Sequence, residues 1–245
     1  MRPLYCEKWL GCWTNGCRTI NVLQERIEQV EERIGRAVAR AGRQRSEVTL
    51  VAVTKKFPAD VICQAHALGL RCFGENYVQE FEGKHADVAK LDGAQFHLIG
   101  HLQSNKTRIA AGLFQAIETI DSAKLARRLD EAAHSLAVTL EAMIEVKLSP
   151  EESKAGADPG QLPNLIAAIR DCPNLRLTGL MTMPPWNDDP EQTRPYFKKL
   201  AELALKHGLA KLSMGMSHDF EVAIEEGATH IRVGRGLFGP RPKPA

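Results

Sequence analysis

The chain has 245 residues, with 32 basic and 30 acidic side chains and a formal net charge of +2. Both signs are spread along the chain, so no basic footprint for nucleic acid is visible. No run approaches the ~20 apolar residues of a membrane helix, and the first residues carry no apolar secretory stretch. Together with the scattered single cysteines, these features predict one soluble cytoplasmic domain without a disulfide framework.

The N-terminal part is expected to comprise a leader and then a helix. Residues 1–20 form a poorly ordered leader in this interpretation, because terminal segments that are not docked into an element are usually mobile. The leader cysteines lack the C-x-x-C spacing of a zinc site, so no metal is predicted there. From Val22 to Ala41 apolar residues recur at helical spacing, and Gly42 follows as a stop signal. We therefore expect an amphipathic helix ahead of the barrel, within a domain of residues 21–245.

After this helix, short apolar runs alternate with longer helical segments. Eight strands are predicted, at residues 48–54, 71–75, 95–100, 116–120, 139–146, 175–181, 211–215 and 230–234. The helices expected between them include 59–68, 78–90, 123–135, 162–170, 191–207 and 221–226. Continuous apolar strands joined by such crossovers are buried on both faces. The pattern predicts a single-domain (β/α)8 TIM-type barrel with an extra N-terminal helix, and a doubly wound open sheet is the alternative.

The first predicted strand ends in LVAVT and is followed by Lys55. In α/β barrels the functional site lies at the C-terminal ends of the strands, so this amine is expected at the barrel mouth. Apolar surroundings lower the pKa of a lysine amine, and an amine so placed can condense with an aldehyde. The alternative is that Lys55 and Lys56 are solvated charges that leave a strand, as most lysines are.

The second and third predicted strands end in polar segments. FGENY carries Asn76 to the mouth, and HLIGHLQSNK carries His97 and His101. Two histidines suggest a metal site, but no carboxylate or thiolate lies nearby in the sequence. Hydrogen-bonded histidines are therefore favoured, and no metal is predicted. Ser104 or Asn105 would begin the next helix.

The last predicted strand runs into the segment Arg232 to Gly239, which contains a formal G-x-G-x-x-G. A dinucleotide site needs a helix that starts within this motif and an acidic residue ~20 positions later, and the few residues that follow provide neither. The glycines can instead bring backbone N–H groups close to an anion. Strand seven ends in Gly215-Met216-Ser217-His218, and barrels often bind phosphate after strands seven and eight. This cup and the Lys55 amine would bracket a small phosphorylated carbonyl compound, either a cofactor or a sugar phosphate.

Several motifs occur together and in order. They are LVAVTKKFP, FGENYVQE, FHLIGHLQSNK, TIDS, SPEESKAG, GLMTM, LSMGMSHDFEVAI and IRVGRGLFG. With them the chain resembles the pyridoxal phosphate homeostasis protein family, from about Val22 to Gly239. The resemblance implies a fold type III barrel, like the N-terminal domain of alanine racemase, in which Lys55 carries pyridoxal 5′-phosphate as a Schiff base. Lys56 falls one place later and is not the candidate.

The same matching implies a phosphate site. Ser217 and the backbone of Gly234 and Arg235 would hold the phosphate group. Two departures from the family's pattern bear on it. The family usually has threonine where this chain has Arg235, and GMSHD replaces a commoner acidic pair. A backbone N–H group or the guanidinium would have to replace the lost hydroxyl contact.

The matching also implies how the cofactor ring is held. Asn76 and Met216 would line the pocket, and Arg232 would face the pyridine nitrogen. A fixed positive charge there disfavours protonation of that nitrogen and weakens the ring as an electron sink. Racemases of this barrel class take a second base from an additional C-terminal domain, whereas this chain stops just after the eighth strand. Of the tyrosines, only Tyr77 lies near a strand end, so no obvious second base replaces that domain.

These points predict a protein that binds pyridoxal phosphate in intracellular homeostasis, releases it to apo-enzymes and is not an enzyme. A monomer is expected, with no nucleic-acid or membrane partner. Two alternatives stay open. One is an amino-acid racemase of the alanine racemase type with weak activity. The other is a Schiff-base aldolase that acts on a sugar phosphate through Lys55 without a cofactor, and such a protein would be colourless.

Overall fold

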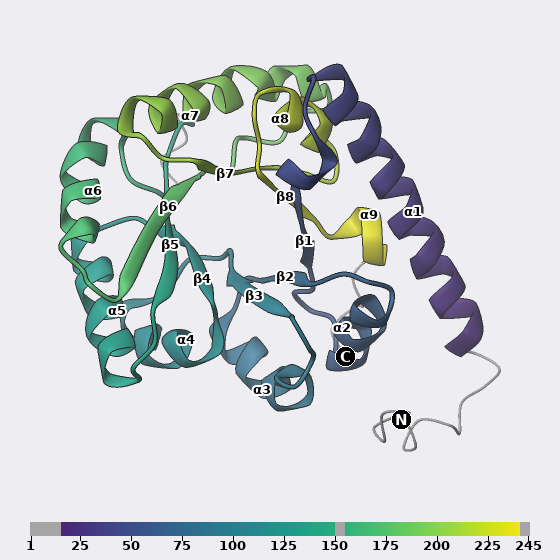
Figure 1. Ribbon diagram of the computed structural model, residues 1–245, viewed down its shortest axis with the longest axis horizontal. Coiled ribbons are helices and arrows are strands. Elements are labelled where there is room, and N and C mark those ends of the chain that lie inside the picture. The colour runs from purple at the N-terminus through teal and green to yellow at the C-terminus, as the bar shows by residue number, and fades with distance from the viewer. Residues whose placement is uncertain (1–15, 150–154, 241–245) are drawn as a thin grey trace.

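Eight parallel strands close into one barrel, which confirms the predicted fold class, and the open-sheet alternative is wrong. The computed structural model describes residues 16–149 and 155–240. The strands are β1 Thr49–Val53, β2 Cys72–Glu75, β3 Gln95–Leu98, β4 Ala116–Ile120, β5 Leu140–Glu145, β6 Leu175–Met181, β7 Lys211–Met216 and β8 His230–Val233. Each strand pairs with the next, and β8 closes the ring by pairing with β1 (Figure 1).

Helices surround the strands on the outside of the barrel (Figure 1). They are α1 Gly16–Arg40, α2 Ala59–Ala67, α3 Val78–Val88, α4 Thr107–Leu113, α5 Ala123–Ser135, α6 Leu162–Arg170, α7 Arg194–His207, α8 Phe220–Glu225 and α9 Arg235–Phe238. Short 3-10 helices lie at η2 Arg45–Glu47, η3 Ser104–Lys106, η4 Pro159–Gln161 and η5 Pro190–Thr193. Among the described residues, no helix is both long and apolar enough to cross a membrane.

Three helical features differ from the sequence expectation. Helix α1 begins at Gly16 rather than Val22, and the part of the expected leader before Gly16 lies outside the described residues. Helix α4 begins at Thr107, after η3, so Ser104 and Asn105 lie within η3 and neither of them is the N-cap of either helix. Helix α9 is a single turn that begins at Arg235 inside the glycine run, where we expected no helix. A segment of four residues is too short to show a helical repeat, so periodicity could not reveal it.

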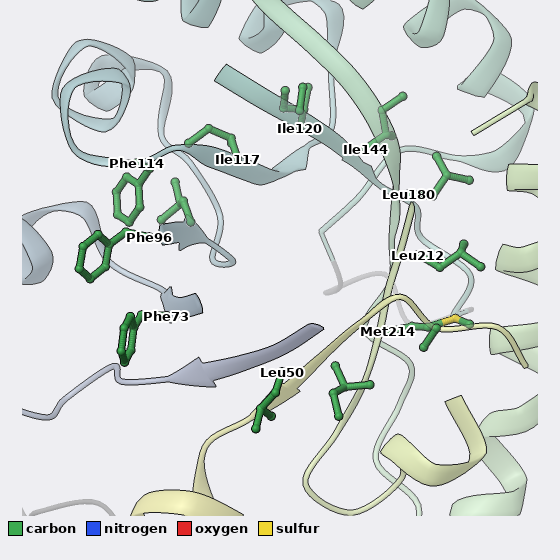
Figure 2. Close-up of a cluster of buried hydrophobic side chains, with 14 of the residues drawn as sticks. Leu50, Phe73, Phe96, Phe114, Ile117, Ile120, Ile144, Leu180, Leu212 and Met214 are labelled. Atoms are coloured by element: carbon green, nitrogen blue, oxygen red, sulfur yellow. The ribbon is translucent and has the colours of Figure 1, made fainter. Parts of the chain in front are cut away.

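The strand side chains that face the helices form the main apolar core (Figure 2). The core includes Leu50 of β1 and Met214 of β7. On β3, the ring of Phe96 lies 4.7 Å from that of Phe81 on α3 and 5.7 Å from that of Phe73 on β2. Apolar surface buried in this way stabilises the fold by roughly 25 cal/mol per Å². The layer between strands and helices therefore holds the barrel together.

The opposite faces of the strands enclose a polar interior, because side chains alternate along a strand. His97 of β3 and His230 of β8 are buried, and their ring centroids lie 6.0 Å apart although their strands are not neighbours. Ser213 of β7 likewise reaches Glu118 of β4. Contacts between non-adjacent strands can form only across the inside of the barrel. The interior thus contains a network of polar side chains that lie beneath the mouth.

Candidate functional site

Lys55 lies at the C-terminal end of β1, where the sequence places it. The strand ends at Val53, and Lys55 is the second residue after it, in a turn at the barrel mouth. The side chain is partly buried. The neighbouring Thr54 N–H donates to the Gly74 carbonyl at 3.0 Å, so the ladder between β1 and β2 continues to the start of this turn. A rigid strand therefore delivers Lys55 to the mouth.

The end of β8 lies directly against the end of β1. A Cβ placed on Gly234 would lie 3.4 Å from the Val53 carbonyl oxygen, which measures how closely the two backbones approach. Helix α9 starts after Gly234, and the Gly236 N–H donates to the Ser217 hydroxyl oxygen at 3.3 Å. The first turn of a helix leaves backbone N–H groups without intrahelical acceptors. The structure therefore brings Ser217 and the glycine run together, one strand away from Lys55.

The turn after β7 depends on Gly215. This residue has a φ of 86°, and a Cβ there would lie 2.5 Å from the Cβ of Ala223. The N–H of Met216 donates to the Asp219 carboxylate at 2.7 Å and closes the turn. Burial raises the pKa of Asp219, while the Met216 N–H and the charge of Arg232 oppose that shift. Met216 also pairs in register with Arg232, so the two predicted pocket residues stand side by side.

Helix α1 supports this turn from outside the barrel, beside α8 and α9 (Figure 1). Arg33 of α1 donates to Glu221 of α8 through two nitrogens, at 2.9 and 2.7 Å. One of these nitrogens also donates to the Ser217 carbonyl at 3.3 Å, and the guanidinium lies 4.4 Å from the centre of the Phe220 ring. Nothing in the sequence pattern pointed to Arg33, because its partners are far away along the chain. The extra helix is thus part of the mouth's architecture.

Asn76 follows β2 and offers a buried polar atom. A Cβ on Gly100 would lie 2.3 Å from the Asn76 carbonyl oxygen, so only glycine lets the end of β3 come this close. The side-chain oxygen of Asn76 is buried and accepts no hydrogen bond within the described part of the chain. Leaving such an oxygen unsatisfied costs about 1–3 kcal/mol. A bound molecule with a donor group would remove that cost, so Asn76 fits a ligand-binding role.

Arg232 points across the interior to β6 and β7. Its guanidinium donates to the Ser213 hydroxyl at 2.6 Å and to the Thr182 carbonyl at 2.8 Å. The Ser213 hydroxyl in turn donates to Glu118 at 2.5 Å. Burial lowers the pKa of Arg232, and the Glu118 carboxylate opposes that shift. Because a guanidinium keeps its proton in proteins, Arg232 is a fixed buried cation.

An ion pair lies next in this network. His97 Nδ1 lies 2.7 Å from Glu118 Oε1. Burial opposes the charged imidazole, but the Cys72 sulfur and Glu118 outweigh it and raise the pKa of His97 to about 10. Burial also opposes the Glu118 carboxylate, but His97 lowers its pKa to about 2. The neighbouring His230 is neutral at pH 7, because burial lowers its pKa to about 4.

The histidines predicted as hydrogen-bonded rather than metal-binding behave differently from each other. His97 is hydrogen-bonded, as predicted, and its partners Glu118 and Cys72 reach it through barrel closure, although neither is near it in the sequence. His101 is exposed and lies 3.7 Å from Asp121. No three His, Cys, Asp or Glu side chains in the described ranges are arranged to hold a metal ion.

The sequence interpretation missed several residues of this network, chiefly Glu118 and Ser213. One signal was available. A carboxylate in the middle of the apolar run AIETI is unusual, because an acidic side chain is almost never fully buried without a partner. The partners themselves could not be read from the sequence.

Comparison with known proteins assigns this barrel to a protein family. The barrel has a lysine after its first strand and a glycine-rich turn after its last strand. The family model described as alanine racemase, N-terminal domain, matches residues 26–242. The chain is therefore a member of this family. The alanine racemase of Clostridium difficile has the same fold at 12% identity and a TM-score of 0.70, covering 91% of this chain and 58% of its own.

More similar proteins narrow this assignment. The pyridoxal phosphate homeostasis protein of Pseudomonas aeruginosa is 45% identical over 224 residues, which cover 91% of this chain and 97% of that protein. Its namesake in Aquifex aeolicus is 42% identical over 223 residues, covering 89% and 97%. The structure of PipY of Synechococcus elongatus with PLP bound has a TM-score of 0.77 at 38% identity, covering 89% of this chain and all of that one. The chain belongs to the pyridoxal phosphate homeostasis protein family.

Proposed function

We propose that this protein binds pyridoxal 5′-phosphate as a Schiff base on Lys55 and serves in intracellular pyridoxal phosphate homeostasis. The observation that carries the proposal is the meeting of Lys55 with the Ser217 and Gly234 turns at neighbouring strand ends. An amine and an anion site at this spacing suit a small phosphorylated aldehyde. The names of the relatives, and the PLP in the PipY structure, support the same cofactor.

The residues at the mouth fit this group. When bound, pyridoxal phosphate supplies an aldehyde carbon that is open to attack by an amine. Lys55 would supply the amine that condenses with this aldehyde, and the aldehyde oxygen would leave as water. The Ser217 hydroxyl and the backbone N–H groups of Gly234 and Arg235 would donate to the phosphate. Asn76 would accept a hydrogen bond through its otherwise unsatisfied side-chain oxygen.

Arg232 supports a carrier rather than an enzyme. We place its guanidinium toward the pyridine nitrogen, held there by Ser213 and Thr182. A guanidinium can donate a hydrogen bond but keeps its charge, so it would disfavour protonation of that nitrogen and leave the ring a weaker electron sink. This disfavours carbanion chemistry. Release of the cofactor to apo-enzymes, a monomeric state and a cytoplasmic location complete the proposal.

The visible absorption spectrum of the purified protein tests the cofactor lysine. We expect wild-type protein incubated with pyridoxal phosphate to become yellow and Lys55→Ala to stay colourless. Lys56→Ala is the matched control and should become yellow like wild type. Borohydride reduction followed by peptide mapping should place the label on Lys55. A label on another lysine, or a yellow Lys55→Ala protein, would contradict the proposal.

Two further measurements separate the proposal from its alternatives. Incubation of the loaded protein with single L-amino acids should yield no D-isomer, whereas a weak racemase would produce it. Incubation of the cofactor-free protein with sugar phosphates should yield no cleavage, whereas an aldolase would act without the cofactor. Transfer is tested by mixing the loaded protein with a PLP-dependent apo-enzyme and measuring recovery of that enzyme's activity.

A further inference from the structure

The turn that carries Lys55 has an unusual backbone. Residues 54–57 form a turn closed by the Phe57 N–H, which donates to the Thr54 carbonyl at 3.0 Å. Within it Lys56 has a φ of 65°, in the left-handed region that favours glycine. For a residue with a side chain this conformation costs roughly 1–2 kcal/mol. A strained turn of this kind persists only where its surroundings hold it.

Lys84 of α3 lies beneath this turn and binds both of its ends. The side chain is 9% exposed. Its ammonium donates to the Thr54 carbonyl at 3.1 Å and to the Phe57 carbonyl at 2.9 Å. The two carbonyls flank Lys55 and Lys56, so one buried cation holds the residues on either side of the functional lysine.

Two carboxylates complete the cluster. Glu75 of β2 lies 2.8 Å from the Lys84 ammonium and accepts the Thr54 hydroxyl at 2.6 Å. Glu80 of α3 lies 3.1 Å from the same ammonium and accepts the backbone N–H of Lys56 at 2.5 Å. The left-handed residue is therefore held through its own N–H group, and the residue before Lys55 through its hydroxyl.

We propose that Lys84, Glu75 and Glu80 are positioning residues for Lys55. They hold the backbone of residues 54–57 in the conformation that sets the direction of the Lys55 side chain at the barrel mouth. This inference rests on the proposed function, in which Lys55 is the amine that reacts. A buried ion pair adds little net stability compared with apolar packing, so its direct contact with this turn favours a geometric role. Placement of a reacting amine within about an ångström strongly affects its rate of reaction.

The first test needs no cofactor. In cofactor-free protein, brief treatment with acetic anhydride followed by mass spectrometry gives the acetylation rate of each lysine. We expect Lys84→Met to change the rate at Lys55 at least threefold, while the rates at Lys198 and Lys199 stay the same. Lys90→Met, which removes an exposed lysine, is the control and should leave Lys55 unchanged. An unchanged rate at Lys55 in Lys84→Met would overturn the proposal.

A second substitution separates geometry from charge. Glycine adopts a φ of 65° without steric cost, so Lys56→Gly should hold the turn's shape when the cluster is broken. We expect the double variant Lys84→Met with Lys56→Gly to recover at least half of the wild-type Lys55 acetylation rate. If Lys84 acted only through its charge, the glycine would restore nothing, and that result would also overturn the proposal.

Binding of pyridoxal phosphate provides a further readout. We expect Lys84→Met to weaken binding about tenfold at unchanged stoichiometry, with borohydride still labelling Lys55. Glu80→Gln, which keeps the shape of the side chain, is the second variant if Lys84→Met does not fold, and should change the Lys55 acetylation rate in the same direction. Different results would contradict the proposed function and the positioning role. Covalent binding retained by Lys55→Ala removes the proposed function, whereas wild-type binding and acetylation in both cluster variants remove only the positioning role.

Discussion

The two faces of the barrel strands differ in chemistry. The outer face packs aromatic and aliphatic side chains such as Phe96 and Leu50 against the helices. The inner face holds His97, Glu118 and Arg232, all of them buried. Apolar packing is non-directional and stabilises in proportion to area, whereas a buried charge is costly unless its partners are well placed. The outer face therefore supplies stability, and the inner face supplies a defined arrangement of charges under the mouth.

The largest effect is expected on the outer face. Phe96→Ala removes a buried ring that contacts Phe73 and Phe81, and should lower the free energy of unfolding by about 3–5 kcal/mol. Urea denaturation monitored by circular dichroism measures it. Phe96→Leu keeps most of the volume and should cost under about 1.5 kcal/mol. Equal losses in both variants would mean that this site does not depend on packing.

The inner face should respond to removal of a charge without loss of volume. Glu118→Gln leaves His97 and Arg232 buried without their carboxylate, and should lower the free energy of unfolding by about 3 kcal/mol. Glu131→Gln, at an exposed position of α5, is the control and should cost under about 0.5 kcal/mol. If the two variants were equally stable, the interior network would contribute nothing to folding.

Alkaline pH should reduce the stability that His97 on the inner face contributes to the fold. Burial opposes the charge on His97, but Cys72 and Glu118 raise its pKa from 6.5 to about 10. Since the folded value exceeds the unfolded one, this stabilisation is complete below pH 6.5 and is lost as the pH rises through about 10. The free energy of unfolding should fall by up to about 1.4 kcal/mol per pH unit in that window.

His97→Gln removes the titrating group and identifies its share of this slope. Urea denaturation at several pH values across the window should give a flatter dependence for the variant than for wild type. Identical slopes in the two proteins would assign the pH dependence to other groups.

The smallest effect is expected for Arg33 of α1, which supports the turn after β7 at the barrel mouth. Arg33→Lys keeps a charge but loses the two-nitrogen contact with Glu221, and a lysine cannot also reach the Ser217 carbonyl. The side chains of Arg33 and Glu221 are 31% and 27% exposed, so their ion pair is partly screened by solvent. We therefore expect the free energy of pyridoxal phosphate binding to weaken by only about 1 kcal/mol, which corresponds to about fivefold weaker binding.

Fluorescence titration with the cofactor measures this difference. Arg36→Lys alters an exposed pair with Glu32 on the same helix and should bind as wild type does. Equal affinities in the Arg33 and Arg36 variants would show that α1 does not support the Ser217 turn.

Much of the fold was predictable because its signals are local. All eight predicted strands are present, and α5 and α6 have the predicted bounds. Lys55 could be placed at the mouth because it directly follows an apolar run, and the turn after β7 was marked by its glycine and serine. The one-turn α9 and the earlier start of α1 were missed, because neither a single turn nor the first residues of a helix carry an apolar repeat.

By itself, the sequence determined the order of the strands and helices and which residues stand at the strand ends, because periodicity and chain adjacency are properties of neighbouring residues. Only the tertiary structure decided which side chains meet. Glu118 is 21 residues from His97 and 95 from Ser213, while Arg33 is 188 residues from Glu221. These contacts exist only because the strands close into a ring and α1 docks on α8, and a separation along the chain carries no information about that closure.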